Sequence, residues 1–199
     1  MNVNVLDLSA YFGLTAVGAM TLNTSLGTLI VFRYSPVRSW PHRKFNYFRL
    51  HNCCGYVALL ASALHPMILL ANRNPKFTVT DILYPVHSPG KPVENTFGAA
   101  ALYVITFVLI TSYLRVRLGR RLWKAFHFSI YFAVVALFFH SVLTVPDLKT
   151  ESVEWLDGGK LFIMGCLILA AGTAFFRWRH SRARARERID GLPGVGALE

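Results

Sequence analysis

"RLHNCCGYVALLASALHPMILLAN" runs from Arg49 to Asn72 and decides the fold, because it is long and apolar enough to cross a membrane and yet carries two histidines. His51 and His65 are fourteen residues apart in it. A hydrocarbon core about 30 Å thick needs roughly 20 apolar residues of helix. Polar groups at that depth are costly and tend to mark function. The stretch therefore predicts a membrane-spanning helix that holds two functional imidazoles.

The rest of the chain has the composition of a membrane protein. Hydrophobic residues make up 54% of its 199 residues and charged residues 16%, against about a quarter charged in soluble domains. In lipid, each long apolar run must be a helix that satisfies its own backbone hydrogen bonds. We therefore expect an all-α integral membrane protein, a bundle of about five transmembrane helices. The expected spans are residues 10–32, 50–71, 97–114, 122–145 and 161–176.

The cations lie between these runs, and their distribution predicts an orientation. Sixteen of the 21 Lys and Arg residues fall on one side of the membrane when the spans alternate in direction. By the positive-inside rule this side is cytoplasmic and the N-terminus is outside. We expect a multi-pass protein of a bacterial inner membrane, in contact with lipid. Nucleic acid is excluded as a partner because the basic segments flank membrane spans. The sixteen are Arg33, Arg38, Arg43, Lys44 and Arg49, then Arg115, Arg117, Arg120, Arg121 and Lys124, then Arg177, Arg179, Arg182, Arg184, Arg186 and Arg188.

Two segments lie outside the expected spans. Residues 72–96 are rich in proline, which predicts a structured or extended external loop. Residues 179–199 are basic and then contain glycine, so we expect a disordered cytoplasmic tail after a membrane domain at 1–178. Such a tail could rest on anionic lipid or serve as a docking surface for an acidic partner.

Two further histidines lie on the fourth expected span, His127 and His140, thirteen residues apart. The second and fourth spans run in the same direction, so His51 and His127 share one depth, and His65 and His140 share another about 20 Å further along. A neutral imidazole is a good axial ligand of haem iron, and facing histidines can hold a haem inside a bundle. We therefore expect two haems between the second and fourth helices.

The thirteen-residue step fits a straight helix poorly. Fourteen residues return to within about 40° of the same face, whereas thirteen miss it by roughly 140°. A bulge, an overwound turn or side chains that reach around a flank would each repair the mismatch, and the sequence leaves all three open.

Four residues near the histidines are candidates for contact with a haem. Gly55, one turn after His51, would let a flat macrocycle approach, although a close helix contact explains a glycine equally well. Arg49, Arg121 and Lys124 lie near the histidines of the basic side and could pair with haem propionates. They could equally be ordinary cytoplasmic anchors of the spans.

The sequence resembles the ferric reductase-like transmembrane domain that ferric reductases, NADPH oxidases and bacterial relatives share. The resemblance rests on "RLHNCCGYVALLASALHPMILL" and "LGRRLWKAFHFSIYFAVVALFFHSVL", and it covers about residues 8–176. It implies that His51 with His127 holds an inner haem b and His65 with His140 an outer one, and that the thirteen-residue step is accommodated. The chain is also similar to the haem-binding membrane subunit of the periplasmic methionine sulfoxide reductase system, which lacks the equivalent of His51.

Two features depart from the family pattern. Many members have six helices where we expect five, and many continue into a flavin and nicotinamide domain. This sequence has no dinucleotide-binding glycine fingerprint, so we expect it to bind neither flavin nor NAD(P). Electrons would then come from a flavoprotein reductase or from a quinol.

The sequence therefore favours a membrane b-type cytochrome, the electron-transfer subunit of a transmembrane reductase. It would carry single electrons through two bis-histidine haems from a cytoplasmic donor to an extracytoplasmic acceptor. The alternative is a non-catalytic subunit or scaffold of a larger redox complex, in which one or two haems are structural.

Overall fold

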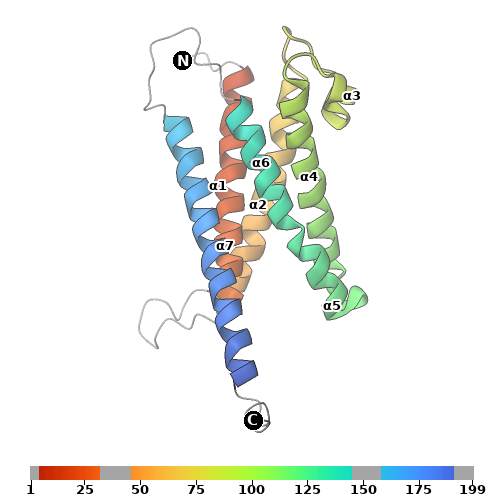
Figure 1. Ribbon diagram of the computed structural model, residues 1–199. Coiled ribbons are helices and arrows are strands. Elements are labelled where there is room, and N and C mark those ends of the chain that lie inside the picture. Colours follow the sequence, from red (N-terminus) through yellow and green to blue (C-terminus); the bar gives the residue numbers. More distant parts are fainter. Residues whose placement is uncertain (1–4, 32–45, 145–157, 191–199) are drawn as a thin grey trace.

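The computed structural model describes residues 5–31, 46–144 and 158–190, and within these ranges it contains helices and no strands. Five helical spans are long and apolar enough to cross a membrane, which confirms the expected all-α membrane architecture (Figure 1). They are α1 (Val5–Val31), α2 (Tyr47–Leu69), α4 (Pro92–Tyr113), the consecutive helices α5 (Arg115–Phe128) and α6 (Ile130–Thr144), and α7 (Gly158–Asp190).

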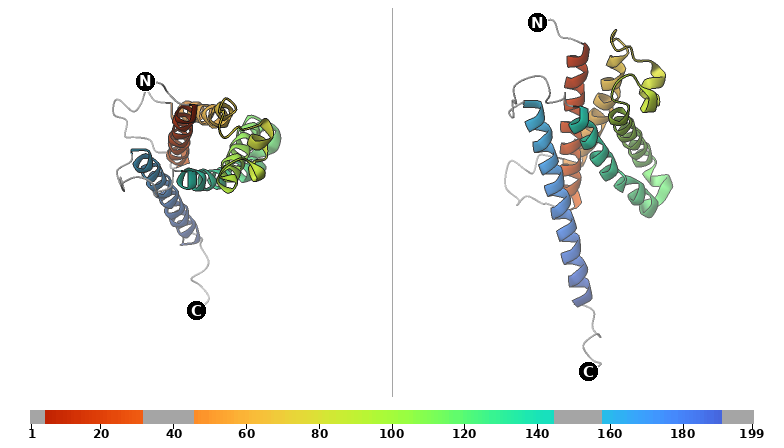
Figure 2. Two further views of the ribbon diagram at one scale, coloured as in Figure 1. Left: turned by 90° about the horizontal axis from the view of Figure 1, so that it is seen from above. Right: turned by 45° about the horizontal axis from the view of Figure 1, so that its top comes forward.

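The bundle consists of two helix pairs and one peripheral helix. α1 packs along α2, and α4 packs along α6, whereas α2 touches α4 and α1 touches α6 over short stretches. α7 lies mainly against α1 at the edge of the bundle, as the view from above in Figure 2 shows. The backbones of α2 and α6 have no extensive contact, so the two pairs are held apart where these helices face each other.

An apolar core joins the two pairs at the middle of the bundle. Alanines with no exposed surface let the helices approach closely there, since a small side chain permits close backbone contact. The cluster consists of Met20, Ala58, Ile105, Val108, Ile130 and Ala133. Along α2 and along the fourth span, its members lie between the two histidine positions.

The fourth span is not one regular helix. Gly119 has φ +73°, a left-handed conformation that glycine adopts without strain, and it bends α5 near its start. At Ser129 the hydrogen bonds tighten, because Ser129 N–H donates to Phe126 C=O (3.1 Å) and Phe132 N–H donates to Ser129 C=O (3.0 Å). Such bonds across three residues wind the chain by about 120° per residue instead of 100°. Of the three open explanations for the thirteen-residue step, overwinding is therefore present and supplies part of the missing rotation.

The loop over residues 72–96 takes the structured form of the two that we expected, and the polar segments contain more helix than expected. The 72–96 loop is structured, with α3 (Val79–Leu83) and the 3₁₀ helix η2 (Pro85–His87), and α4 begins earlier than expected because Pro92 suits the first helical turn. Residues 179–190 of the basic tail are helical in the structure. They continue α7 beyond the bundle, since alanine and arginine are strong helix formers (Figure 1). Residues 191–199 lie outside the described ranges.

The described cations of the basic segments gather at one end of the bundle, formed by the start of α2, by α5 and by the C-terminal part of α7 (Figure 1). We call this the basic end, and the end that carries α3 and η2 the opposite end. Arg33, Arg38, Arg43 and Lys44 lie outside the described residues.

Candidate functional site

The four histidines of the spans meet in two pairs, each between the two halves of the bundle. The ring centroids of His51 and His127 are 6.1 Å apart, near the basic end. Those of His65 and His140 are 5.9 Å apart, nearer the opposite end. Each pair thus joins α2 to the fourth span at a point where the backbones are held apart.

Three of the four imidazoles are fixed by a hydrogen bond to the backbone of a neighbouring helix. A carbonyl oxygen can only accept, so Nδ1 carries the hydrogen in each bond and the Nε2 of the neutral ring keeps a lone pair for a metal. The Ser9 hydroxyl strengthens one of these contacts by donating to the His65 carbonyl (2.9 Å). The bonds run from His51 to Asn23 C=O (2.9 Å), from His65 to Ser9 C=O (2.7 Å) and from His140 to Glu94 C=O (2.8 Å).

A glycine follows each accepting carbonyl by four residues, one turn along the same helix. A Cβ on Gly27 would lie 3.3 Å from the His51 ring, one on Gly13 would lie 3.2 Å from the His65 ring, and one on Gly98 would lie 2.9 Å from the His140 ring. The missing side chains therefore let each imidazole reach a carbonyl that also belongs to the helix ladder. We call these three residues the backing glycines.

Sequence reasoning missed the backing glycines and the carbonyls before them. A signal was present, because Gly13 and Gly27 are fourteen residues apart, the same separation as His51 and His65 on the neighbouring helix. Helices that pack side by side with equal spacings can repeat one contact at two depths.

His127 is held differently. Its Nδ1 is 3.3 Å from the Ser112 hydroxyl oxygen, which also accepts from the Trp123 indole N–H at 3.4 Å. The Trp123 ring lies beside the imidazole, with 5.2 Å between the centroids. Ser112 follows Gly98 by fourteen residues on α4, so it occupies the place of a fourth backing glycine and offers a hydroxyl as the hydrogen-bond partner.

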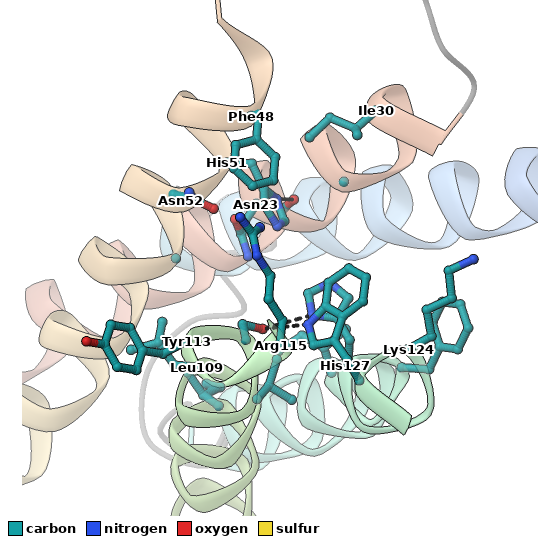
Figure 3. Close-up of a pocket in the computed structure, with 18 of the residues that line it drawn as sticks. Asn23, Ile30, Phe48, His51, Asn52, Leu109, Tyr113, Arg115, Lys124 and His127 are labelled. Carbon is teal, nitrogen blue, oxygen red and sulfur yellow. Dashed lines mark hydrogen bonds between the residues drawn. The ribbon is translucent and has the colours of Figure 1, made fainter. Parts of the chain in front are cut away.

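A cavity of about 390 Å³ lies beside His51 and His127 (Figure 3). Its walls are mostly apolar and come from the helices of both halves and from α7. The cations Arg115, Lys124 and Arg177 line it, and none of the described residues in its wall is acidic. The charge of the cavity therefore favours a ligand that is largely apolar and carries negative groups.

The structure places the four expected accessory residues unequally. Gly55 and Lys124 line the cavity, although a Cβ on Gly55 would make only an ordinary contact, 3.7 Å from the Asn23 side chain. Arg49 and Arg121 are exposed and are absent from the cavity wall. Helical periodicity explains this, because Arg49 precedes His51 by two residues, which turns it about 200° away. Arg121 precedes His127 by six residues and is likewise turned about 120° off that face.

Two arginines that the sequence analysis did not select line the cavity instead of Arg49 and Arg121. The Arg115 guanidinium lies 5.4 Å from the centre of the Phe48 ring, so it reaches across the cavity to α2. Arg177 of α7 donates to the Tyr131 hydroxyl (3.1 Å) and lies over the Phe128 ring (4.8 Å). In the described part of the chain neither guanidinium pairs with a carboxylate, so their charges are available to an anionic ligand.

Comparison with known proteins places these features in a family. The family model described as "Ferric reductase like transmembrane component" matches residues 12–138, which is more than half of the chain. The match includes His51, His65 and His127, ends two residues before His140 and leaves out α7. No curated protein and no solved structure matches the chain. The chain therefore belongs to the ferric reductase-like transmembrane component family, whose domains generally bind haem, and this membership indicates a membrane redox component.

Proposed function

We propose that this protein is a membrane b-type cytochrome that carries single electrons across the bilayer through two bis-histidine haems. His51 and His127 would ligate the haem at the basic end, and His65 and His140 the haem nearer the opposite end. The observation that carries the proposal is the pairing of the four imidazoles across the bundle.

The separation of the paired rings suits one iron atom between them. Imidazole nitrogens bind transition-metal ions at about 2 Å, and the ring centre lies about 1.1 Å behind the nitrogen, so two imidazoles that held one iron between them would have centroids about 6 Å apart. The two pairs, at 6.1 Å and 5.9 Å, agree with this value.

The number of ligands favours a haem over a bare metal ion. Among the described residues there is no group of three or more His, Cys, Asp or Glu side chains that could hold a metal ion by themselves. Two imidazoles are sufficient when a porphyrin supplies the remaining ligands. When bound, haem iron supplies one-electron chemistry by changing between two oxidation states.

The chain itself would hold and orient the ligands. Bonds from Nδ1 to the helix carbonyls fix the ring direction and make Nε2 a better donor to a metal. The backing glycines permit those bonds. The apolar core between the two histidine levels keeps water out of the centre of the bundle and provides the low-polarity shell that tunes a redox centre.

Arg115, Lys124 and Arg177 are the residues that we propose for the carboxylates of the haem at the basic end. They line the cavity without acidic neighbours in the described wall. Arg49 and Arg121 keep the role of membrane anchors.

The orientation and partners follow from charge. The gathering of described cations at one end supports a cytoplasmic position for that end and for the C-terminus. Its positive field would attract an acidic flavoprotein reductase, and a quinol is the other donor that we consider. The acceptor would lie on the extracytoplasmic side of a bacterial inner membrane.

Electron transfer across sealed vesicles tests the function. With a reductant supplied only at the basic face and an impermeant ferric chelate at the other face, we expect haem absorbance to change to the reduced form and the chelate to be reduced. A scaffold with structural haems would show the spectrum without reduction across the membrane. Purified protein without a reducible b-type spectrum would refute the proposal.

Single histidine substitutions test the pairing. We expect His51→Ala and His65→Ala each to lower the haem content from two per chain to one, because each removes an axial ligand of a different haem. The measurement is the haem extracted per protein, together with the difference spectrum. His87→Ala is the control, because His87 is an exposed residue of η2, and it should retain both haems. Retention of both in either test variant contradicts the pairing.

The backing glycines can be tested at the tightest position. In Gly98→Ala the new methyl would lie 2.9 Å from His140, so the ring must move and its bond to Glu94 must lengthen. Loss of such a supporting bond typically weakens metal binding by about 10- to 100-fold. We expect loss or altered absorbance of the haem nearer the opposite end alone. Gly165→Ala is the matched control, because its Cβ would meet nothing within 4 Å. Equal spectra for the two variants would contradict a positioning role.

Arg177 should raise the reduction potential of the haem at the basic end, since a nearby positive charge favours the reduced state. We expect Arg177→Gln to lower one of the two midpoint potentials by several tens of millivolts. Arg179→Gln, two residues further along α7 and exposed, should leave both potentials unchanged. The check is a spectroscopic redox titration, and an unchanged potential in Arg177→Gln would remove this residue from the site.

A further inference from the structure

The segment from residue 78 to residue 88 turns four of its large apolar side chains away from the protein, while Pro85 is buried. It contains α3 and η2 and connects α2 to α4 at the opposite end. The exposed fractions of its large apolar side chains are high, although the same segment packs against α4. They are 59% for Val79, 55% for Leu83, 68% for Tyr84 and 45% for Val86.

Several polar groups of the 78–88 segment have partners within the protein. Thr78 and Asp81 form a capping box at the start of α3, in which Thr78 N–H donates to the Asp81 carboxylate (2.8 Å). Tyr84 N–H donates to Thr80 C=O (2.7 Å). The Asn95 amide of α4 donates to the Ser88 hydroxyl (3.1 Å). Each of these bonds lowers the cost of placing the segment against lipid, because lipid offers no partner to a free polar group.

A hydrogen bond fixes the depth of the segment. The Tyr103 hydroxyl donates to the Leu83 carbonyl. Tyr103 follows Pro92, the first residue of α4, by eleven positions, or about 16 Å along the axis. Helical side chains lean toward the N-terminus by about one turn, so the hydroxyl lies roughly 10 Å beyond the start of α4. The chain therefore folds back beside α4 instead of standing above it.

The segment lies on the side of α4 that faces away from the histidines. Glu94 and Gly98 contact His140, and Tyr103 projects about half a turn away from them. On the Tyr103 flank, Phe107 is 43% exposed and Ile110 is 53% exposed. These side chains belong to a helix that is long and apolar enough to cross a membrane, so we expect their exposed surface to contact lipid. Figure 1 shows α3 beside this outer flank of α4, so the apolar surface of the segment continues the lipid-facing surface of the bundle.

We infer that the 78–88 segment is an interfacial element that embeds Val79, Leu83 and Tyr84 in the lipid leaflet at the opposite end. Interfacial helices place their apolar face about 5–10 Å into the boundary between headgroups and acyl chains, and Leu83 lies at a similar distance from the start of α4. Arg73 and Lys76 are exposed just before the segment, where phosphate groups would meet them. Tyr84 has the amphipathic ring that is typical of membrane interfaces.

The function of this interfacial element would be to fix the opposite end of the bundle relative to the membrane surface. η2 and α3 contact α4, and α4 supplies the carbonyl that holds His140. This inference depends on the membrane spans and not on the presence of haem, so it can fail or succeed independently of the proposed function.

Spin labels in lipid vesicles test the inference. In a background with Cys53, Cys54 and Cys166 changed to serine, single cysteines are introduced as Leu83→Cys, Asn74→Cys and Ile110→Cys and labelled with a nitroxide. The full chain is reconstituted in phosphatidylcholine vesicles. Collision rates are then measured with oxygen, which concentrates in lipid, and with a water-soluble nickel chelate. Asn74 is the matched aqueous control in the same connection, and Ile110 is the lipid-facing control.

We expect the oxygen-to-nickel collision ratio of the label at 83 to be several-fold higher than at 74 and to lie between the values at 74 and 110. A ratio at 83 equal to that at 74 would overturn the inference, because the segment would then be in water. Low collision with both reagents would also overturn it, because a protein surface, such as a second copy of this chain, would then cover the segment. Retained helical circular dichroism shows that each labelled variant is folded.

Discussion

The rest of this structure depends on one constraint, the need of a membrane-embedded imidazole for a partner at its second nitrogen. In the bundle a backbone carbonyl fulfils this need for His51, His65 and His140. Such a carbonyl already accepts a bond within its own helix, so the ring can reach it only where the next turn has no side chain. The backing glycines follow from this requirement, and they bring α1 against α2 and α4 against α6.

This constraint also explains why the bundle has two halves. Each histidine is tied to a helix of its own half, so its other nitrogen points toward the opposite half. The apolar core joins the halves at mid-depth, and above and below it the paired rings stand about 6 Å apart. The core thus separates two polar levels, and the fourteen-residue spacings on α1 and α2 set these levels at matching depths.

The sequence was sufficient for those features that depend on the length of each helix and on the depth of a residue along it. The lengths of the apolar runs predicted the five spans, and the equal depths of the histidines along their helices predicted which of them meet. Features that depend on the register between helices could not be predicted in this way, such as the carbonyls of Asn23 and Glu94 behind the rings. Arg115 and Arg177 were missed because the bend at Gly119 and the position of α7 bring them to the cavity. The helical form of residues 179–190 follows from helix propensity, which the prediction for the tail did not consider.

The histidine rings at the two levels are held by different hydrogen-bond partners. At the opposite end, both rings are bound to helix carbonyls with a glycine behind each. At the basic end, His127 relies on a longer contact to Ser112, and the adjoining cavity is lined by cations from α5 and α7. A hydroxyl can rotate and can donate or accept, whereas a helix carbonyl is fixed in direction and can only accept. The basic level is therefore the more adaptable of the two, which suits the side at which we place the electron donor.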